Sequence, residues 1–186
     1  MPMRMRGIVA VAVLILCGTV FAEGFEKGDA ELSFRISYVD VDFGSTQGLD
    51  LGGTTDAELT FAGGWLLTQS HELGLSLGYV KQEIEGGDVF QSEDTDGTSL
   101  GAFYNYNFTT TSSVTIPFIG FNFAALGGDV GDVYNFQYGV EAGLKIYPFE
   151  HGGVVFSIGY TELVAEEDQL PDGSALSLGG GLLLRF

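Results

Sequence analysis

The sequence predicts an all-β protein, an eight-stranded antiparallel up-and-down transmembrane β-barrel. Apolar and polar residues alternate with a period of two in eight segments, and the connections between them alternate between short and long. Only 17% of the residues are charged, whereas soluble domains carry about 25%. A length of 186 residues fits a single domain.

Residues 1–22 are predicted to be a signal peptide. A basic start precedes the apolar run Ile8–Cys17, and Val20 and Ala22 supply the small residues that signal peptidase requires. A membrane anchor is the alternative, but this run is too short to span about 30 Å of hydrocarbon. We therefore expect export and cleavage after Ala22, which leaves residues 23–186 as one barrel domain.

The first four segments each have one apolar face. Single polar or small residues separate their apolar positions, which is typical of a β-strand with two unlike faces. The segments span residues 30–38, 55–67, 72–79 and 99–108, and their apolar positions include Ala30, Leu32, Phe34, Ile36, Tyr38, Ala57, Leu59, Phe61, Trp65, Leu67, Leu73, Leu75, Leu77, Tyr79, Leu100, Ala102, Tyr104, Tyr106 and Phe108.

The last four segments continue the pattern and bring the count of predicted strands to eight. In segment 134–146 the alternation is the most regular, with seven bulky or apolar residues at even positions from Tyr134 to Ile146. The other three segments span residues 117–125, 154–160 and 176–186.

The connections predict two unlike ends of the barrel. Short links lie near residues 68–71, 109–115 and 149–153, and longer ones near residues 39–54, 80–98, 126–133 and 162–174. An up-and-down membrane barrel has short turns at one end and long loops at the other. The long links carry 16 of the 25 acidic residues, so we expect acidic loops at one end.

The composition of the two faces indicates which one points inward. The polar face consists mainly of Gly, Ser, Thr and Asn, whereas a water-exposed surface usually carries about 25–35% charged residues. The apolar face is bulky throughout, and the interior of eight strands has little room for so many rings. A soluble barrel such as a lipocalin would place this face inside, so the residue types favour a membrane barrel.

Charged residues on the polar strand face predict an ion-pair network in the lumen. Unpaired charges in so narrow a barrel would be costly, so pairing is expected. A plug that stabilises the barrel is favoured, because eight strands leave room for little more than side chains; a narrow, gated ion pathway is the alternative. Glu72 and Asp56 share this face with the expected network, which comprises Glu31, Arg35, Glu58, Glu141, Lys145 and Arg185.

Aromatic residues near both ends of the segments predict two girdles at the membrane interfaces. Those near the short turns are Trp65, Phe108, Tyr147 and Phe149, and those near the long loops are Tyr38, Tyr79, Tyr134 and Tyr160. The C-terminal stretch, with Gly181, Leu184 and the final Phe186, resembles the assembly signal of outer-membrane barrels.

From Ala30 to Phe186 the chain resembles the small eight-stranded outer-membrane β-barrel proteins, the OmpA/OmpX-like group. The stretches Pro117–Phe121 and Tyr138–Tyr147 and the terminal Phe186 carry the resemblance. It implies the outer membrane of a Gram-negative cell, periplasmic termini, and the long loops facing outward. Outer-membrane lipid, lipopolysaccharide and the barrel assembly machinery are then the expected partners, and the function stays open.

Several classes of function are not expected. A net charge of −18 disfavours nucleic acid, and Cys17, inside the signal, is the only cysteine. The G-x-S-x-G match at 74–78 lies within a strand, whereas a nucleophilic serine needs a sharp turn. His71 and His151 fall on short turns, away from the outer leaflet. We therefore expect no enzyme, no cofactor and no dedicated metal site, although calcium at the acidic loops stays open.

The sequence thus predicts a non-enzymatic outer-membrane barrel with a structural or surface-interaction role. The alternative is a minor, porin-like channel for small or hydrophobic solutes. No residue pattern identifies a surface ligand.

Overall fold

The computed structural model describes residues 25–42, 45–46, 49–50, 53–85, 93–109, 114–132, 134–165 and 173–186. The predicted signal peptide, residues 1–22, lies outside this part of the chain. Among the described residues, no helix has the length and apolar character to cross a membrane.

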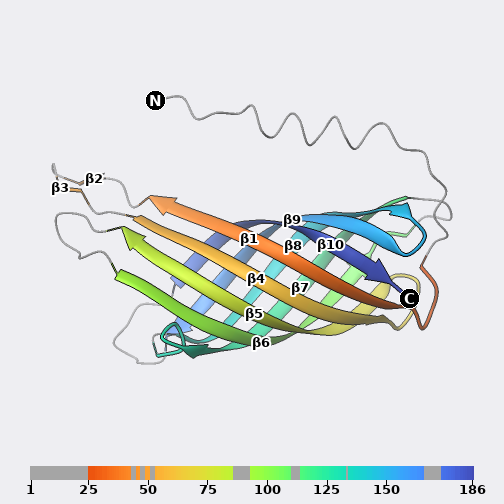
Figure 1. Ribbon diagram of the computed structural model, residues 1–186, viewed down its shortest axis with the longest axis horizontal. Helices are drawn as coiled ribbons and strands as arrows, with labels where there is room; N and C mark the ends of the chain where they lie inside the picture. The colour runs from red at the N-terminus through yellow and green to blue at the C-terminus, as the bar shows by residue number, and fades with distance from the viewer. Residues whose placement is uncertain are drawn as a thin grey trace.

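Eight strands form one closed antiparallel barrel, which confirms the predicted fold class (Figure 1). The order around the barrel is β1-β10-β9-β8-β7-β6-β5-β4, so chain neighbours pair and β1 closes on β10. A short hairpin of β2 and β3 connects β1 to β4. The strands are β1 (Ala30–Asp42), β2 (Ser45–Thr46), β3 (Leu49–Asp50), β4 (Gly53–Leu66), β5 (His71–Glu85), β6 (Glu93–Asn107), β7 (Thr115–Gly128), β8 (Tyr134–Phe149), β9 (Gly152–Ala165) and β10 (Gly173–Arg185).

The barrel strands extend further towards the long-loop end than the alternation predicts. β5 runs to Glu85 instead of ending near Tyr79, and β6 begins at Glu93 instead of Ser99. Crossing the hydrocarbon takes about 9–11 residues of a tilted strand. Backbone pairing continues beyond that length because the hydrogen-bond ladder does not depend on apolar side chains. Periodicity therefore marked the apolar band and missed the ends of the strands.

The bulky apolar residues point outward along the barrel wall. Leu75, Leu100 and Leu178 are each more than 60% exposed, although they are among the most hydrophobic side chains in the chain. Gly, Ser and charged residues occupy the alternate positions, which face inward. The apolar face is thus the outer one, as a membrane barrel requires.

The N-terminal residues of the described chain close the short-turn end, where the C-terminus also lies (Figure 1). The backbone N–H of Ala30 donates to Phe186 at 3.0 Å, and that of Gly28 donates to Leu66 at 2.9 Å. These bonds hold the segment before β1 at the barrel mouth. Phe25 enters the lumen there and joins an apolar cluster with Leu66, Ile116, Phe118, Tyr147, Val155 and Leu183.

Six of the eight predicted girdle aromatics are exposed on the outer face, namely Tyr38, Trp65, Tyr79, Phe108, Phe149 and Tyr160. The placement of Tyr147 is wrong, because its side chain is 1% exposed and lies in the lumen. Tyr147 lies two residues after the inward Lys145, so strand alternation turns both side chains the same way. A register shift between Ile146 and Phe149 then returns Phe149 to the outer face.

The placement of Tyr134 in the outer girdle is also wrong, because Tyr134 lines a cavity inside the barrel. A register shift separates Tyr134 from Phe136, so the alternation of β8 is broken at its first residues. Of the residues in the predicted assembly signal, Leu184 and Phe186 are exposed on the outer face. Gly181 pairs with Arg35 across the β1–β10 junction.

We predict that Gly181→Ala destabilises the barrel, whereas Gly180→Ala next to it is tolerated. A Cβ at Gly181 would lie 2.2 Å from the carbonyl oxygen of Phe34, which is backbone. A Cβ at Gly180 would meet nothing closer than 3.7 Å. Overpacking of this kind costs about 1–3 kcal/mol. Folded barrel and boiled protein should migrate differently in SDS gels, and Gly181→Ala should lower the temperature of that shift. Equal temperatures for both variants would contradict this packing.

Candidate functional site

A buried lysine links three walls of the lumen near the short-turn end. Lys145 in β8 is 0% exposed, and its Nζ lies 2.8 Å from Glu31 Oε1 and 2.6 Å from Glu72 Oε2. Glu31 is in β1 and Glu72 in β5, and each of these strands is three places away from β8 around the barrel. The two ion pairs therefore cross the interior instead of joining adjacent strands.

Neighbouring side chains add hydrogen bonds to both carboxylates of this cluster. Glu72 Oε2 accepts hydrogen bonds from Asn105 Nδ2 at 3.0 Å and Asn107 Nδ2 at 3.5 Å. The Tyr147 hydroxyl donates to Glu31 Oε2. Buried charges are tolerated only when they are paired and hydrogen-bonded. We call Glu31, Glu72 and Lys145, with these three polar partners, the lysine cluster.

Aromatic rings cover the lysine cluster from the barrel mouth. Lys145 Nζ lies 5.5 Å from the ring centres of Phe25 and Phe118. The Arg185 guanidinium lies 6.0 Å from the ring centre of Phe25 and 5.6 Å from that of Tyr147. Rings at these distances attract cations through their negative faces. The short-turn end of the lumen is thus filled by packed rings and paired charges.

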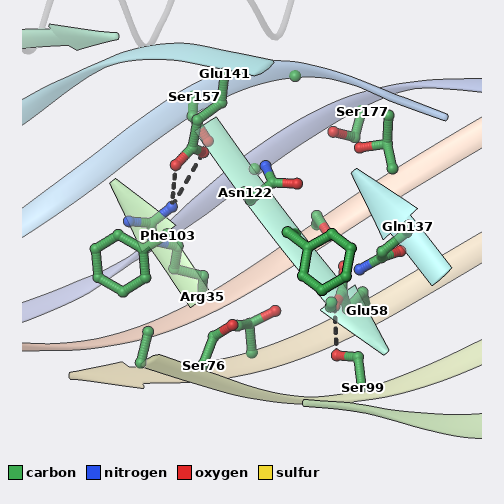
Figure 2. A pocket seen from close by; sticks show the side chains of 18 residues that line it. Arg35, Glu58, Ser76, Ser99, Phe103, Asn122, Gln137, Glu141, Ser157 and Ser177 are labelled. Atoms are coloured by element: carbon green, nitrogen blue, oxygen red, sulfur yellow. Dashed lines mark hydrogen bonds and ion pairs between the residues drawn. The ribbon is translucent and has the colours of Figure 1, made fainter. Parts of the chain in front are cut away.

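A second ion pair lies four residues nearer the long-loop end on β1 and β8. Arg35 Nη1 donates to both carboxylate oxygens of Glu141, at 3.0 and 3.1 Å (Figure 2). The pair again spans the three-strand separation between β1 and β8. Arg35 Nε is buried and has no hydrogen-bond partner among the described residues, so within that part of the chain the guanidinium does not use all its donors.

This ion pair forms part of the wall of a polar cavity in the lumen, whose volume is about 120 Å³. Its lining residues point towards a shared space from all sides of the barrel (Figure 2). Each of the eight barrel strands contributes a hydroxyl or amide side chain, namely Ser37, Thr60, Ser76, Ser99, Asn122, Gln137, Ser157 and Ser177. A cavity of this volume and polarity has room for several waters.

A second cavity of about 80 Å³ adjoins the first, and five residues line both: Ser37, Glu58, Gln137, Thr161 and Ser177. Its other walls are largely apolar and include Val80, Leu126, Val130, Tyr134 and Leu163. Glu58 therefore lies where the polar and apolar parts of the lumen meet. Ser99 Oγ donates to Glu58 Oε1 at 3.3 Å (Figure 2).

The six residues of the predicted network all line the barrel interior, but they form separate groups. Lys145 binds Glu31, Arg35 binds Glu141, Glu58 bonds with Ser99, and Arg185 packs on rings. Sequence analysis left Glu72 out of the network, although strand alternation placed it on the correct face. Asn105, Asn107 and Tyr147 were also missed as partners, and their inward positions were the only signal available.

Solved structures of other proteins share the architecture of this chain, although its sequence matches no known family. No family model matches the sequence, and no curated protein matches it. Neisserial surface protein A matches the structure with a TM-score of 0.61 and 15% identity, covering 86% of this chain and 98% of that one. The outer membrane protein OprG from Pseudomonas aeruginosa matches with a TM-score of 0.54 and 14% identity, covering 89% and 99%.

This chain has the fold of the small eight-stranded outer-membrane β-barrels. A de novo designed transmembrane β-barrel also matches, with a TM-score of 0.52, 7% identity and coverage of 88% and 99%. A designed protein shares the architecture at such low identity because strand number, tilt and alternation define the fold. The comparisons therefore establish the fold alone, because one fold serves many unrelated functions. The residues of the lumen provide the evidence for the function of this protein.

We predict that Lys145→Met destabilises the barrel by about 3–5 kcal/mol, because it leaves Glu31 and Glu72 buried without their cation. Lys27→Met is the matched control, since Lys27 is exposed and its replacement should change stability by less than about 0.5 kcal/mol. Urea unfolding in phospholipid vesicles measures both.

Adding Glu31→Gln and Glu72→Gln to Lys145→Met should recover most of the lost stability, because no uncompensated carboxylate then remains in the cluster. If the Lys145→Met and Lys27→Met variants unfold at the same urea concentration, the lysine cluster does not stabilise the barrel.

Proposed function

We propose that this protein is a non-enzymatic, integral outer-membrane barrel with a structural or surface-interaction role. The outward apolar wall supports residence in a bilayer, and the signal-like residues 1–22 support export. Outer-membrane lipid and lipopolysaccharide are the proposed surroundings. The terminal Phe186 is proposed to be read by the barrel assembly machinery of a Gram-negative cell.

The observation that carries this proposal is the lysine cluster across the lumen. A permeating ion would have to separate Lys145 from Glu31 and Glu72 at contact distances of 2.6 to 2.8 Å. It would also have to pass Phe25, which is buried at the same end. Separating buried ion pairs costs several kcal/mol. We therefore infer that the barrel is closed at its short-turn end.

The residues of the lumen support a role without catalysis. The polar groups that line the two cavities are carboxylates, hydroxyls, amides and one arginine, and the described residues of both linings include neither a histidine nor a lysine. His71 begins β5 and His151 lies in the turn after β8, both at the short-turn end. In the described chain, no group of three or more His, Cys, Asp and Glu could hold a metal ion.

The outer end of the barrel is acidic in this proposal. Asp129 and Asp132 lie in the turn between β7 and β8, and Glu162 lies near the loop end of β9. Negative charge at this end disfavours anionic partners and favours cationic or neutral ones. A surface partner of this chain is therefore expected to present basic or uncharged groups.

A minor channel for small or hydrophobic solutes is the second candidate, because the loop-end half of the lumen contains the two adjoining cavities. Through-passage would require the lysine cluster to open. The structural role is preferred since the three charges of the cluster are paired with one another, and an opened state would leave both carboxylates and the ammonium without these partners.

Planar-bilayer recording distinguishes these roles. We expect folded protein, verified by its heat-dependent gel mobility, to insert without steady single-channel steps, because the lysine cluster and Phe25 fill the lumen. Steady steps whose conductance changes in Arg35→Ala, but not in the exposed-site control Lys27→Ala, would contradict the closed barrel and establish the channel. Recovery of the protein in the periplasm instead of the outer-membrane fraction would contradict the membrane location.

A further inference from the structure

Glu58 is a lumen carboxylate that the ion pairs described above do not use. Among the described residues, the ion pairs of the lumen join Arg35 to Glu141 and Lys145 to Glu31 and Glu72, and none of them includes Glu58. Its hydrogen bonds come from neutral hydroxyls, Ser99 Oγ at 3.3 Å and the side chain of Thr60. When it is ionised, a carboxylate in so narrow a space is stabilised by a cation beside it.

The remaining charges around the cavities cancel. Arg35 and Glu141 both line the polar cavity and neutralise each other through two hydrogen bonds. Among the described residues, no other charged side chain lines the apolar cavity. With Glu58 ionised, the described residues that line the two cavities therefore carry one net negative charge, which complements a ligand with one positive charge.

The backbone beneath Glu58 is arranged so that its carboxylate can lie against the wall. Gly78 of β5 faces this point, and a Cβ there would lie 2.7 Å from Glu58 Oε1 and 2.3 Å from Ser99 Oγ. The absence of a side chain at Gly78 leaves the room that both polar groups occupy. Glu58 is thereby positioned at the junction of the two cavities.

Apolar side chains cover the space on the loop-end side of Glu58. Val130 belongs to the turn between β7 and β8, and its side chain is buried. Two backbone hydrogen bonds hold this turn: the Val130 N–H donates to Asp96 O at 3.3 Å, and the Val130 carbonyl accepts from Tyr134 N at 2.9 Å. Val80, Leu126 and Leu163 complete this wall. An inorganic ion would gain nothing from these groups, whereas a hydrocarbon portion would be removed from water.

We propose that the loop-end half of the lumen binds a small organic monocation, with its ammonium or guanidinium group at Glu58 and its apolar portion against Val80, Leu126 and Leu163. The ring of Tyr134 lines the same cavity and adds a surface that attracts cations. A divalent metal ion is disfavoured, because calcium takes six to eight oxygen ligands, commonly from several carboxylates. The two cavities, of about 120 and 80 Å³, suit a ligand of a few heavy atoms.

Titration of the folded full chain in detergent micelles with n-butylammonium tests the proposal. The side-chain methyl groups of Val80, Leu126, Val130 and Leu163 report on the cavity by NMR, and those of the outward Leu75 and Leu100 serve as internal controls. We expect saturable shifts at the cavity methyls only. n-Butanol, potassium chloride and calcium chloride at the same concentrations should not reproduce or compete with them.

Three variants localise the effect. Glu58→Gln should weaken binding by about tenfold or more, because a charge-assisted hydrogen bond is lost. Gly78→Ala keeps the charge but displaces the carboxylate, so it should weaken binding without changing the fold. Glu162→Gln is the matched control, since it removes a carboxylate that bonds with Tyr138 on the outer face at the same end of the barrel. It should bind n-butylammonium as the unaltered chain does.

Each other result would overturn the proposal. Absence of saturable shifts in the unaltered chain would mean that the cavities hold only water. Equal shifts with n-butanol would make the site one for neutral apolar solutes, and equal or tighter binding of calcium would make it a metal site. Unchanged binding in Glu58→Gln, or equal losses in Glu58→Gln and Glu162→Gln, would exclude recognition by Glu58. None of these readouts depends on whether the barrel conducts ions.

Discussion

The pairing of β1 with β10 is the contact on which the rest of the structure depends. Eight residue pairs, from Glu31 with Arg185 to Tyr38 with Leu178, join the first barrel strand to the last. Reciprocal hydrogen bonds between Ala30 and Phe186 complete the ladder at the short-turn end. Closure leaves no strand edge in the apolar band, where unpaired backbone groups would cost several kcal/mol each. It also divides every strand into an outer face for lipid and an inner face for the lumen.

Closure of the barrel confines the inward-facing charged side chains to a narrow lumen, where several of them are paired with one another. Inward charges such as Lys145 and Glu72 are held in a space too narrow for bulk water, so each must find a partner across the barrel. The ion pairs reach over three strands instead of one, which ties opposite walls together. The same narrowness leaves Glu58 facing a cavity with no ion-pair partner among the described residues, because Arg35 in that cavity pairs with Glu141. The narrow lumen thus accounts both for the ion pairs that stabilise the short-turn end and for the carboxylate of Glu58, which has no ion-pair partner among the described residues, towards the long-loop end.

Much of the fold could be predicted because a strand turns its side chains with a strict period of two. That rule predicted eight strands, the outward face of Phe34 and Leu100, and the inward face of Lys145 and Arg35. It gave no information where the register changes, so Tyr134 was assigned to the wrong face. Tyr147 was assigned wrongly for another reason: its aromatic character was given more weight than its odd position. Ion-pair partners were harder still, since the inward face of each strand offers several carboxylates at different heights.

The sequence by itself determined the strand count, the apolar band and the set of charges that must face inward, because these follow from alternation along one strand at a time. Only the tertiary structure decided which carboxylate meets which cation. That choice depends on the stagger between strands far apart in the chain, such as β1 and β8, and the stagger is set by closure around the whole barrel. Phe25 is the clearest example: it precedes the first strand, and only the closed mouth of the barrel accounts for its burial.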